Sequence, residues 1–295
     1  MTTPLGWHCF GSSKESVPSV LLLHGFLGSA ADWLPLAKTM GTRNRRYVCP
    51  DLPGHGTVQH ILDGADAGMA EVAAAVVDVL KKRRIGPCSL AGYSMGGRLA
   101  LYLAAHYPDR FTHLVLISAS PGIEGAEARR KRRMEDKQLA LHLKQFHQAW
   151  EAPECVVNPR HPEHSEPSWD MDFASFLKRW YAQPLFDSLQ EKPEVLDRIL
   201  ERRSQNHPRA LAASLVGLGT GAQPSLWNRL ESVKIPVLLV TGGRDEKFNG
   251  IAAAMKARLP RAQHQVMDNC SHCPQEEEPV HFVSILKAFL DGEKE

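Results

Sequence analysis

Residues 92–96 of this chain read GYSMG. The apolar run 88–92 leading into this stretch is typical of a buried strand, and residues 97–106 after it have the apolar spacing of a helix. A serine with glycine on both sides, between a strand and a helix, indicates a sharp turn that lifts the hydroxyl out of the backbone as a nucleophile elbow. We therefore predict that Ser94 is the reactive residue of an enzyme. A serine that only caps a helix is the alternative interpretation.

Short apolar runs alternate with longer helical patterns along the chain. Six runs favour strands, at 20–23, 46–49, 88–92, 113–118, 236–241 and 264–267. Parallel strands that are buried on both faces have such unbroken apolar runs, and a crossover helix must join each strand to the next. Residues 69–84 and 279–290 have apolar side chains at helical spacing. The sequence therefore predicts an α/β fold with a mostly parallel sheet flanked by helices.

The alternation of strands and helices stops between residues 121 and 224. Strand-like runs disappear there and charged residues become more frequent, while prolines at 153, 159, 162 and 167 predict an exposed loop. We interpret this stretch as an inserted helical lid. The predicted organisation is a core in two parts, 1–120 and 225–295, with the lid at 121–224, which accommodates 295 residues without a second independent core.

Composition limits the partners of this chain. Lys and Arg number 35 against 33 Asp and Glu, and the formal charge of +2 provides no general attraction for nucleic acid or an anionic membrane. No apolar run approaches the roughly 20 residues that span a bilayer, and residues 1–10 do not resemble a secretory signal. Scattered cysteines suit a reducing compartment. We predict a cytoplasmic protein that neither binds nucleic acid nor inserts into a membrane; the oligomeric state is not indicated.

Two further loops belong with the elbow. HGF, residues 24–26, follows the first predicted strand, where an oxyanion hole takes one of its donors. We predict that the backbone N–H groups of Phe26 and Met95 form this hole. A glycine turn with a structural histidine is the alternative interpretation of HGF. DLPGHG, residues 51–56, is predicted to be a structural turn that lines the cleft.

A reactive serine needs a neutral imidazole within hydrogen-bond reach, and the imidazole needs a carboxylate that fixes its tautomer. Where the serine elbow comes first, the chain order is serine, acid, histidine. Asp245 follows the fifth predicted strand, and His272 lies between the last strand and the last helix. We predict that these two residues complete a triad with Ser94. His264 and Asp268 are the alternative base and acid.

Cysteines at 270 and 273 form the one CxxC of the chain. We favour two small residues that pack around His272 over a redox or zinc site, because no second CxxC accompanies the pair. The chain also lacks other metal-ligand spacings and a phosphate-binding glycine loop. We therefore predict that the site uses no metal and no cofactor.

Arginines are the remaining candidates for binding. Residues 129–133 read RRKRR, which is interpreted as a helix with a solvated face or as a basic patch. At 3.6 residues per turn, Arg129, Arg132 and Arg133 share one side, so one or two of them can face the cleft. Arg98 lies one helical turn after Ser94, and the pair 202–203 can add cations. Several guanidinium groups near the serine would indicate a substrate with several carboxylates.

These motifs together resemble the 2-succinyl-6-hydroxy-2,4-cyclohexadiene-1-carboxylate synthase family of menaquinone biosynthesis, which are lyases on the α/β-hydrolase fold. The matching stretches are HGF (24–26), DLPGHG (51–56), GYSMGGR (92–98), PGI (121–123) leading into GAEARRKRR, RWYAQPLF (179–186), RRSQN (202–206) and GGRDEKF (242–248). The resemblance implies Ser94, Asp245 and His272 as triad and Phe26 and Met95 as oxyanion hole. It also implies a substrate-binding set of Tyr93, Arg98, Arg132, Trp180 and Arg203.

The resemblance further implies a reaction. Ser94, polarised by His272, would act as the base that starts the elimination of pyruvate from a small anionic substrate, 2-succinyl-5-enolpyruvyl-6-hydroxy-3-cyclohexene-1-carboxylate. A serine carboxylesterase or carbon–carbon bond hydrolase with the same triad is the alternative, and a binding protein that retains the fold is a third interpretation. Two features depart from the family: residues 270–271 are Cys-Ser where a small residue and glycine are usual, and segment 153–169 is longer.

Overall fold

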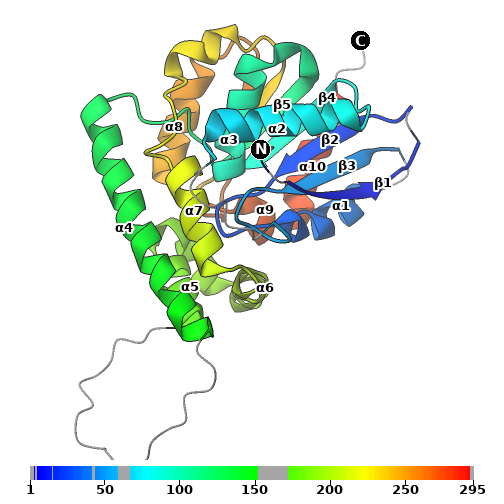
Figure 1. Ribbon diagram of the computed structural model, residues 1–295. Helices are drawn as coiled ribbons and strands as arrows, with labels where there is room; N and C mark the ends of the chain where they lie inside the picture. The colour runs from blue at the N-terminus through cyan, green and yellow to red at the C-terminus, as the bar shows by residue number, and fades with distance from the viewer. Residues whose placement is uncertain are drawn as a thin grey trace, which may run out of the picture.

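A seven-stranded sheet forms the centre of the protein in the computed structural model (Figure 1). The structure describes residue 3 and residues 5–14, 16–41, 44–58, 67–151 and 172–292. The strands follow the order β1-β3-β2-β4-β5-β6-β7, and only β1 runs antiparallel to its neighbour. Their bounds are β1 Gly6–Gly11, β2 Ser19–Leu23, β3 Arg46–Asp51, β4 Cys88–Tyr93, β5 Phe111–Ile117, β6 Val237–Gly242 and β7 Ala262–Met267. The predicted α/β fold with a mostly parallel sheet is confirmed.

The first strand was not predicted from the sequence. β1 lies at the edge of the sheet, where none of its residues is fully buried, so it lacks the unbroken apolar run of the central strands. It pairs in register with β3, Gly6 opposite Asp51 and Gly11 opposite Arg46. An antiparallel edge strand with one solvated face carries too weak a pattern to be recognised between two glycines.

Helices cover both faces of the sheet (Figure 1). Alternate residues of β2 enter two separate cores: Leu21 and Leu23 pack with residues of α2, α3 and α8, whereas Val20 and Leu22 pack with residues of α1 and α10. Burial on both faces is the reason for the continuous apolar runs seen in the sequence. The bounds of these helices are α1 Leu34–Met40, α2 Met69–Lys82, α3 Met95–His106, α8 Glu246–Lys256, α9 Pro274–Glu277 and α10 Pro279–Asp291.

A group of helices is inserted between β5 and β6. In Figure 1 they gather at one side of the sheet, with the long α4 beside α7. They are α4 Ala126–Glu151, α5 Phe173–Tyr181, the 3-10 segment η3 Pro184–Glu191, α6 Pro193–Ser204 and α7 Pro208–Leu218; the short η1 Ala30–Asp32 and η4 Trp227–Ser232 lie in the core. The described residues between β5 and β6 form no strand, as the predicted helical insert requires. The predicted loop at 153–169 lies outside the described residues.

The turn between β4 and α3 depends on close backbone packing. Ser94 has φ 48° and ψ −107°, a left-handed conformation that is uncommon for a serine. A Cβ on Gly92 would come within 2.3 Å of the Gly96 carbonyl oxygen, and one on Gly96 within 2.3 Å of the Leu23 carbonyl oxygen. Both flanking glycines are therefore required by space, and the turn presents Ser94 at the carboxyl end of the sheet.

Among the described residues, no helix combines the length and the apolar character that crossing a bilayer requires.

Candidate active site

One chain of hydrogen bonds joins the three residues predicted as a triad. The Nε2 atom of His272 lies 3.1 Å from the Ser94 hydroxyl oxygen, and its Nδ1 atom lies 2.8 Å from Asp245 Oδ2. The carboxylate can only accept, so Nδ1 carries the hydrogen and Nε2 is free to accept the serine proton. The side chains of His272 and Asp245 are 4% and 2% exposed, which strengthens this electrostatic chain, while Ser94 remains half-buried.

The parallel sheet brings these residues together from distant parts of the sequence. Ser94 follows β4, Asp245 begins α8 just after β6, and His272 follows β7, so all three stand at the carboxyl ends of strands. A Cβ on Gly242 would lie 2.0 Å from the Ser271 carbonyl oxygen, so the histidine loop lies directly on the end of β6. Oδ1 of Asp245 accepts the backbone N–H of Phe248 at 3.1 Å, which fixes the carboxylate.

The alternative base and acid lie elsewhere. The Nε2 atom of His264 contacts the Thr241 hydroxyl at 2.7 Å, in the middle of β7. Asp268 is exposed and does not contact His272 in the described residues. The geometry therefore favours the assignment of Asp245 and His272 made from chain order.

Aromatic rings surround the His272 imidazole on several sides. The ring centroids of Phe248, Tyr93 and Phe186 lie 4.5, 5.6 and 5.7 Å from it. Tyr93 is buried, and burial raises the pKa of its hydroxyl well above the usual value, so the ring is neutral. These contacts restrict rotation of the imidazole. They also place Tyr93, which is predicted to bind substrate, directly beside His272.

The backbone N–H groups of Phe26 and Met95 are the two donors predicted for an oxyanion hole. Within the described residues, neither the N–H of Phe26 nor that of Met95 has a hydrogen-bond acceptor. Met95 begins α3, whose amino-terminal N–H groups carry partial positive charge. Unpaired donors of this kind are what an oxyanion hole requires, and the role of both residues stays a prediction.

Two buried neutral histidines support the loop that carries Phe26. His24 donates from Nδ1 to the Gly25 carbonyl at 2.8 Å, and its Nε2 accepts the Leu52 N–H at 2.9 Å. Nε2 of His55 accepts the Leu27 N–H at 3.2 Å. Burial lowers the pKa of both imidazoles, that of His55 to about 3. His24 therefore has the structural role that was the alternative interpretation of HGF, and His55 anchors the predicted structural turn.

Two arginines lie near each other beyond the elbow. Arg98 is 8% exposed and donates from Nη1 to Gln223 Oε1 at 3.0 Å. Burial, with a smaller contribution from the neighbouring Arg132, lowers the pKa of Arg98 to about 10. The Arg132 Nε donates to Asp136 Oδ1 at 2.7 Å, and this guanidinium is half-buried. The two guanidinium groups thus lie near each other, that of Arg132 paired with Asp136, and Arg98 is a single helical turn from Ser94.

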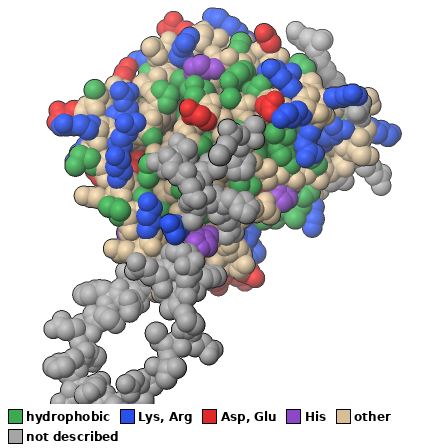
Figure 2. Space-filling model, viewed as in Figure 1, with side chains coloured by type: hydrophobic (Ala, Val, Ile, Leu, Met, Phe, Trp, Pro, Cys, Tyr) green, Lys and Arg blue, Asp and Glu red, His purple; other side chains and the backbone are tan. Residues whose placement is uncertain are grey.

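The other residues of the RRKRR stretch, 129–133, differ in how exposed they are to solvent. Arg129 is half-buried like Arg132, whereas residues 130, 131 and 133 are exposed. Figure 2 shows basic side chains on the surface over α4, the helix that holds them. The predicted division of this helix into a solvated face and a partly covered face is thus present in the structure.

Arg203 and Trp180 take up different surroundings. Trp180 lies edge-on to Phe26, with ring centroids 5.7 Å apart, beside the proposed oxyanion hole. The Arg203 guanidinium is buried, donates to Asp32 through Nη1 and to the Tyr181 hydroxyl through Nε at 3.1 Å. Direct contact of Arg203 with a substrate remains a prediction.

An ion network around Arg203 was missed by the sequence analysis. Arg202 donates from Nη2 to both carboxylate oxygens of Glu276 at 2.7 Å and from Nε to Asp32 at 3.0 Å. The network joins η1, which follows the oxyanion loop, to α6 and to α9, which follows the histidine. The capping box at 29–32 could have indicated a structural role for Asp32. No pattern in the sequence predicts its ion pair with Arg202, which lies 170 positions later.

The cysteines at 270 and 273 pack around His272. Both are buried free thiols, and burial raises the pKa of Cys270 to about 12 and that of Cys273 well above its usual value. Such thiols are poor nucleophiles and poor metal ligands. The packing interpretation of the CxxC agrees with these surroundings.

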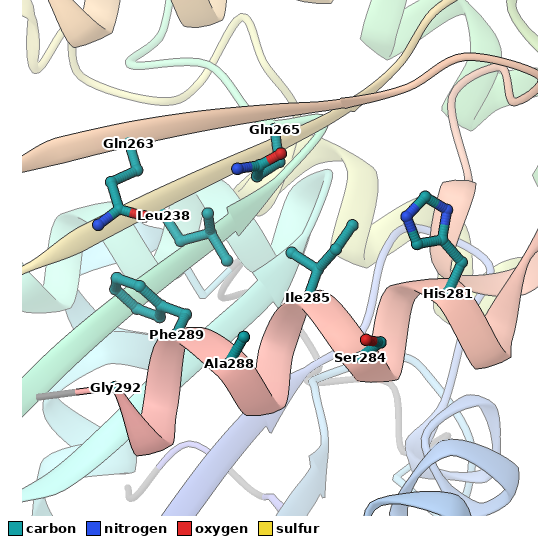
Figure 3. A pocket seen from close by; sticks show the side chains of 9 residues that line it. All are labelled: Leu238, Gln263, Gln265, His281, Ser284, Ile285, Ala288, Phe289 and Gly292. Carbon is teal, nitrogen blue, oxygen red and sulfur yellow. The ribbon is translucent and has the colours of Figure 1, made fainter.

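A separate groove lies between the edge strand β7 and α10. Figure 3 shows Gln263 and Gln265 on one side of it and Ile285 and Phe289 on the other. None of the residues that line it belongs to the hydrogen-bonded triad. The groove is therefore distinct from the candidate active site.

Comparisons with known proteins agree with this geometry. The α/β hydrolase fold family matches residues 18–279. A Bacillus subtilis protein named "Putative 2-succinyl-6-hydroxy-2,4-cyclohexadiene-1-carboxylate synthase" is 33% identical, over 92% of this chain and 90% of its own length. A Yersinia pseudotuberculosis 2-succinyl-6-hydroxy-2,4-cyclohexadiene-1-carboxylate synthase is 31% identical over 94% of this chain and 89% of its own. This chain belongs to that synthase family.

Solved structures of known proteins have the same fold. The structure of MenH from S. aureus superposes with a TM-score of 0.84 at 28% identity and covers 100% of both chains. A thermophilic esterase from Thermogutta terrifontis superposes with a TM-score of 0.73 at 22% identity, a likeness that shows the fold alone. The α/β-hydrolase fold and the resemblance to the synthase family, both inferred from the sequence, are confirmed.

The two buried histidines generate a prediction about pH. Unfolded chains bind a proton near the ordinary histidine pKa of 6.5, whereas folded His55 binds one only near 3. Acid therefore favours the unfolded state, and the free energy of unfolding should fall as the pH drops from about 6.5 towards 3, by up to ~1.4 kcal/mol per pH unit for each such histidine. His55→Gln should reduce this slope in urea titrations between pH 6 and 4.

The exposed His281 on α10 offers a matched control. His281→Gln should leave the wild-type slope unchanged. An equal slope in wild type and His55→Gln would show that the buried neutral imidazole of His55 does not contribute to acid sensitivity.

Proposed function

We propose that this chain eliminates pyruvate from 2-succinyl-5-enolpyruvyl-6-hydroxy-3-cyclohexene-1-carboxylate, giving 2-succinyl-6-hydroxy-2,4-cyclohexadiene-1-carboxylate, in menaquinone biosynthesis. The observation that carries the proposal is the Ser94 hydroxyl held 3.1 Å from His272 Nε2, with the imidazole paired to Asp245. Relatives that cover most of the chain bear the name of this activity. A cytoplasmic location suits a small soluble anionic substrate and is part of the proposal.

In the proposed mechanism Ser94 acts as a base. Its oxygen takes a proton from a ring carbon of the substrate as His272 Nε2 accepts the hydroxyl hydrogen, and Asp245 stabilises the imidazolium that forms. The electron pair left on that carbon forms a new ring double bond, the existing ring double bond shifts by one position towards the carbon that bears the enolpyruvyl group, and the bond from that carbon to the enolpyruvyl oxygen breaks. The departing enolpyruvate takes up on carbon the proton that the His272 imidazolium gives back, and becomes pyruvate, which returns Ser94 and His272 to their starting states. Every proton transfer in this scheme uses residues of the chain itself.

The backbone donors and the aromatic rings would assist this step. Negative charge that develops on a carbonyl oxygen of the substrate would be stabilised by the N–H groups of Phe26 and Met95, each worth roughly 3 kcal/mol of barrier lowering in a water-poor site. Trp180, which lies beside Phe26, would shield this carbonyl oxygen of the substrate from water. Tyr93, packed on His272, would border the ring of the substrate.

The arginines favour a lyase over an ester hydrolase. Burial first and repulsion from Arg132 second lower the pKa of Arg98, and Asp136 offsets only part of this, so an anion that binds beside the two guanidinium groups would stabilise both. A substrate with several carboxylates meets this need, whereas an ordinary ester pocket is mostly apolar. Such charges are unnecessary in a carboxylesterase.

Pyruvate release tests the proposed activity directly. The purified protein, given the enolpyruvyl substrate, should release pyruvate far above the uncatalysed rate, as measured by coupled oxidation of NADH with lactate dehydrogenase. It should cleave p-nitrophenyl acetate only slowly. Ser94→Ala should lower kcat for pyruvate release by at least ~10³-fold, because it removes the proposed base. Rapid ester cleavage without pyruvate release would instead identify a serine hydrolase.

The Arg132→Ala variant tests whether Arg132 binds a carboxylate of the proposed substrate. Loss of a charge-assisted hydrogen bond to substrate should raise KM by about 10- to 100-fold with a smaller change in kcat. Lys131→Ala, an exposed cation on the same helix, is the matched control and should leave KM near the wild-type value. If both variants have wild-type KM, Arg132 does not bind the substrate.

A further inference from the structure

A buried carboxylate holds the chain on both sides of His272. The Glu277 side chain, in α9, is 0% exposed. Its Oε1 atom accepts the backbone N–H of Ser271 at 2.9 Å and the Ser271 hydroxyl at 3.0 Å. The same oxygen accepts the Cys273 thiol at 3.6 Å. One carboxylate oxygen therefore binds the residue immediately before the histidine and the residue immediately after it.

The second oxygen of Glu277 reaches the inserted segment η3 and the residue that follows it. Oε2 accepts a short hydrogen bond from the Ser188 hydroxyl and lies 3.7 Å from Lys192 Nζ. The same segment also contacts the histidine directly, since the His272 N–H donates to the Leu185 carbonyl at 3.2 Å. Glu277 thus bridges the histidine loop and the inserted helices.

Several hydrogen-bond donors surround the buried Glu277 carboxylate. A buried carboxylate is costly unless several donors satisfy it, and an apolar side chain of similar volume would serve simple packing equally well. Here the donors converge from two separate elements. Burial and the Glu277 carboxylate keep the pKa of the Cys273 thiol high, so this thiol stays protonated and donates. Hydrogen bonds to the histidine loop and to η3 therefore suit an orienting role for this side chain better than simple packing.

We propose that Glu277 is a positioning residue for His272, which accepts the proton of Ser94: it fixes the direction of the His272 imidazole and couples that direction to the position of η3. Without the carboxylate, the backbone on either side of the histidine loses its anchor and Nε2 departs from the Ser94 hydroxyl. The inference rests on the part of the proposed function that makes His272 the base of Ser94. It does not depend on the identity of the substrate.

The rate at which a fluorophosphonate labels Ser94 tests the inference without any substrate. In this reaction the Ser94 oxygen bonds to phosphorus, fluoride leaves, and the serine proton passes to His272, so the rate reports the alignment of the pair. Intact-mass spectrometry would give the second-order rate constant. Glu277→Ala should lower it by about 10- to 100-fold, because a small misplacement of a catalytic group has effects of that size. Glu277→Gln, whose amide oxygen can still accept from Ser271, should lose less.

Partner and control variants sharpen the test. Ser188→Ala removes the hydrogen bond from η3 and should lower the labelling rate by about 2- to 10-fold, the effect of one neutral hydrogen bond. Glu278→Gln is the matched control: it removes a carboxylate one residue away that is 49% exposed and pairs with Lys192. Its rate should stay within about twofold of wild type, as for an exposed ion pair.

Pyruvate release then separates positioning from general stability. For Glu277→Gln, kcat should fall while KM stays near wild type, at a temperature where circular dichroism shows the variant fully folded. Wild-type labelling rates for the folded Glu277 variants would overturn the inference, as would equal losses in Glu278→Gln or losses that only follow the unfolded fraction. A wild-type chain that is labelled at Ser94 yet releases no pyruvate would reject the proposed substrate and leave the inference on Glu277 standing.

Discussion

The bond between Asp245 and the Nδ1 atom of His272 is the interaction on which the site depends. At 2.8 Å and with both side chains almost fully buried, it selects one imidazole tautomer and directs the other nitrogen at Ser94. The parallel sheet makes this possible, because the carboxyl ends of β4, β6 and β7 meet at one edge. Close backbone contact at Gly242 then carries the histidine loop over the end of β6. The fold thus supplies alignment, and the side chains supply the chemistry.

The titratable groups around this bond differ in how deeply they are buried and in which residues they contact. The histidines that hold the oxyanion loop stay neutral because burial lowers the pKa of both. Cationic groups are separated into two sets. Arg202 and Arg203 pair with Asp32 and Glu276, whereas Arg98 donates to the neutral amide of Gln223 and has Arg132 and its partner Asp136 nearby. In the proposed function, an anionic substrate binds next to Arg98. Positive charge at this point distinguishes the site from an apolar ester pocket.

The sequence contained enough to predict the sheet, the elbow and the order of the triad. The elbow could be recognised because Gly92 and Gly96 are required by space, and the acid and base because their order along the chain is constrained by strand order. Local patterns cannot reveal pairings between distant residues. The contacts of Asp32 with Arg203 and of Glu277 with Ser188 join residues 171 and 89 positions apart, and only the folded chain brings them together. The edge strand β1 was missed for a different reason, its half-exposed surface.

The tautomer of His272 tests the central interaction most directly. In ¹⁵N-histidine NMR spectra of the wild-type protein, with the signal assigned by comparison with His272→Gln, we predict the tautomer of the imidazole that bears its hydrogen on Nδ1. Replacement of Asp245 by asparagine should allow the other tautomer to form. A wild-type spectrum with the hydrogen on Nε2 would contradict the account, because that nitrogen could then not accept the proton of Ser94.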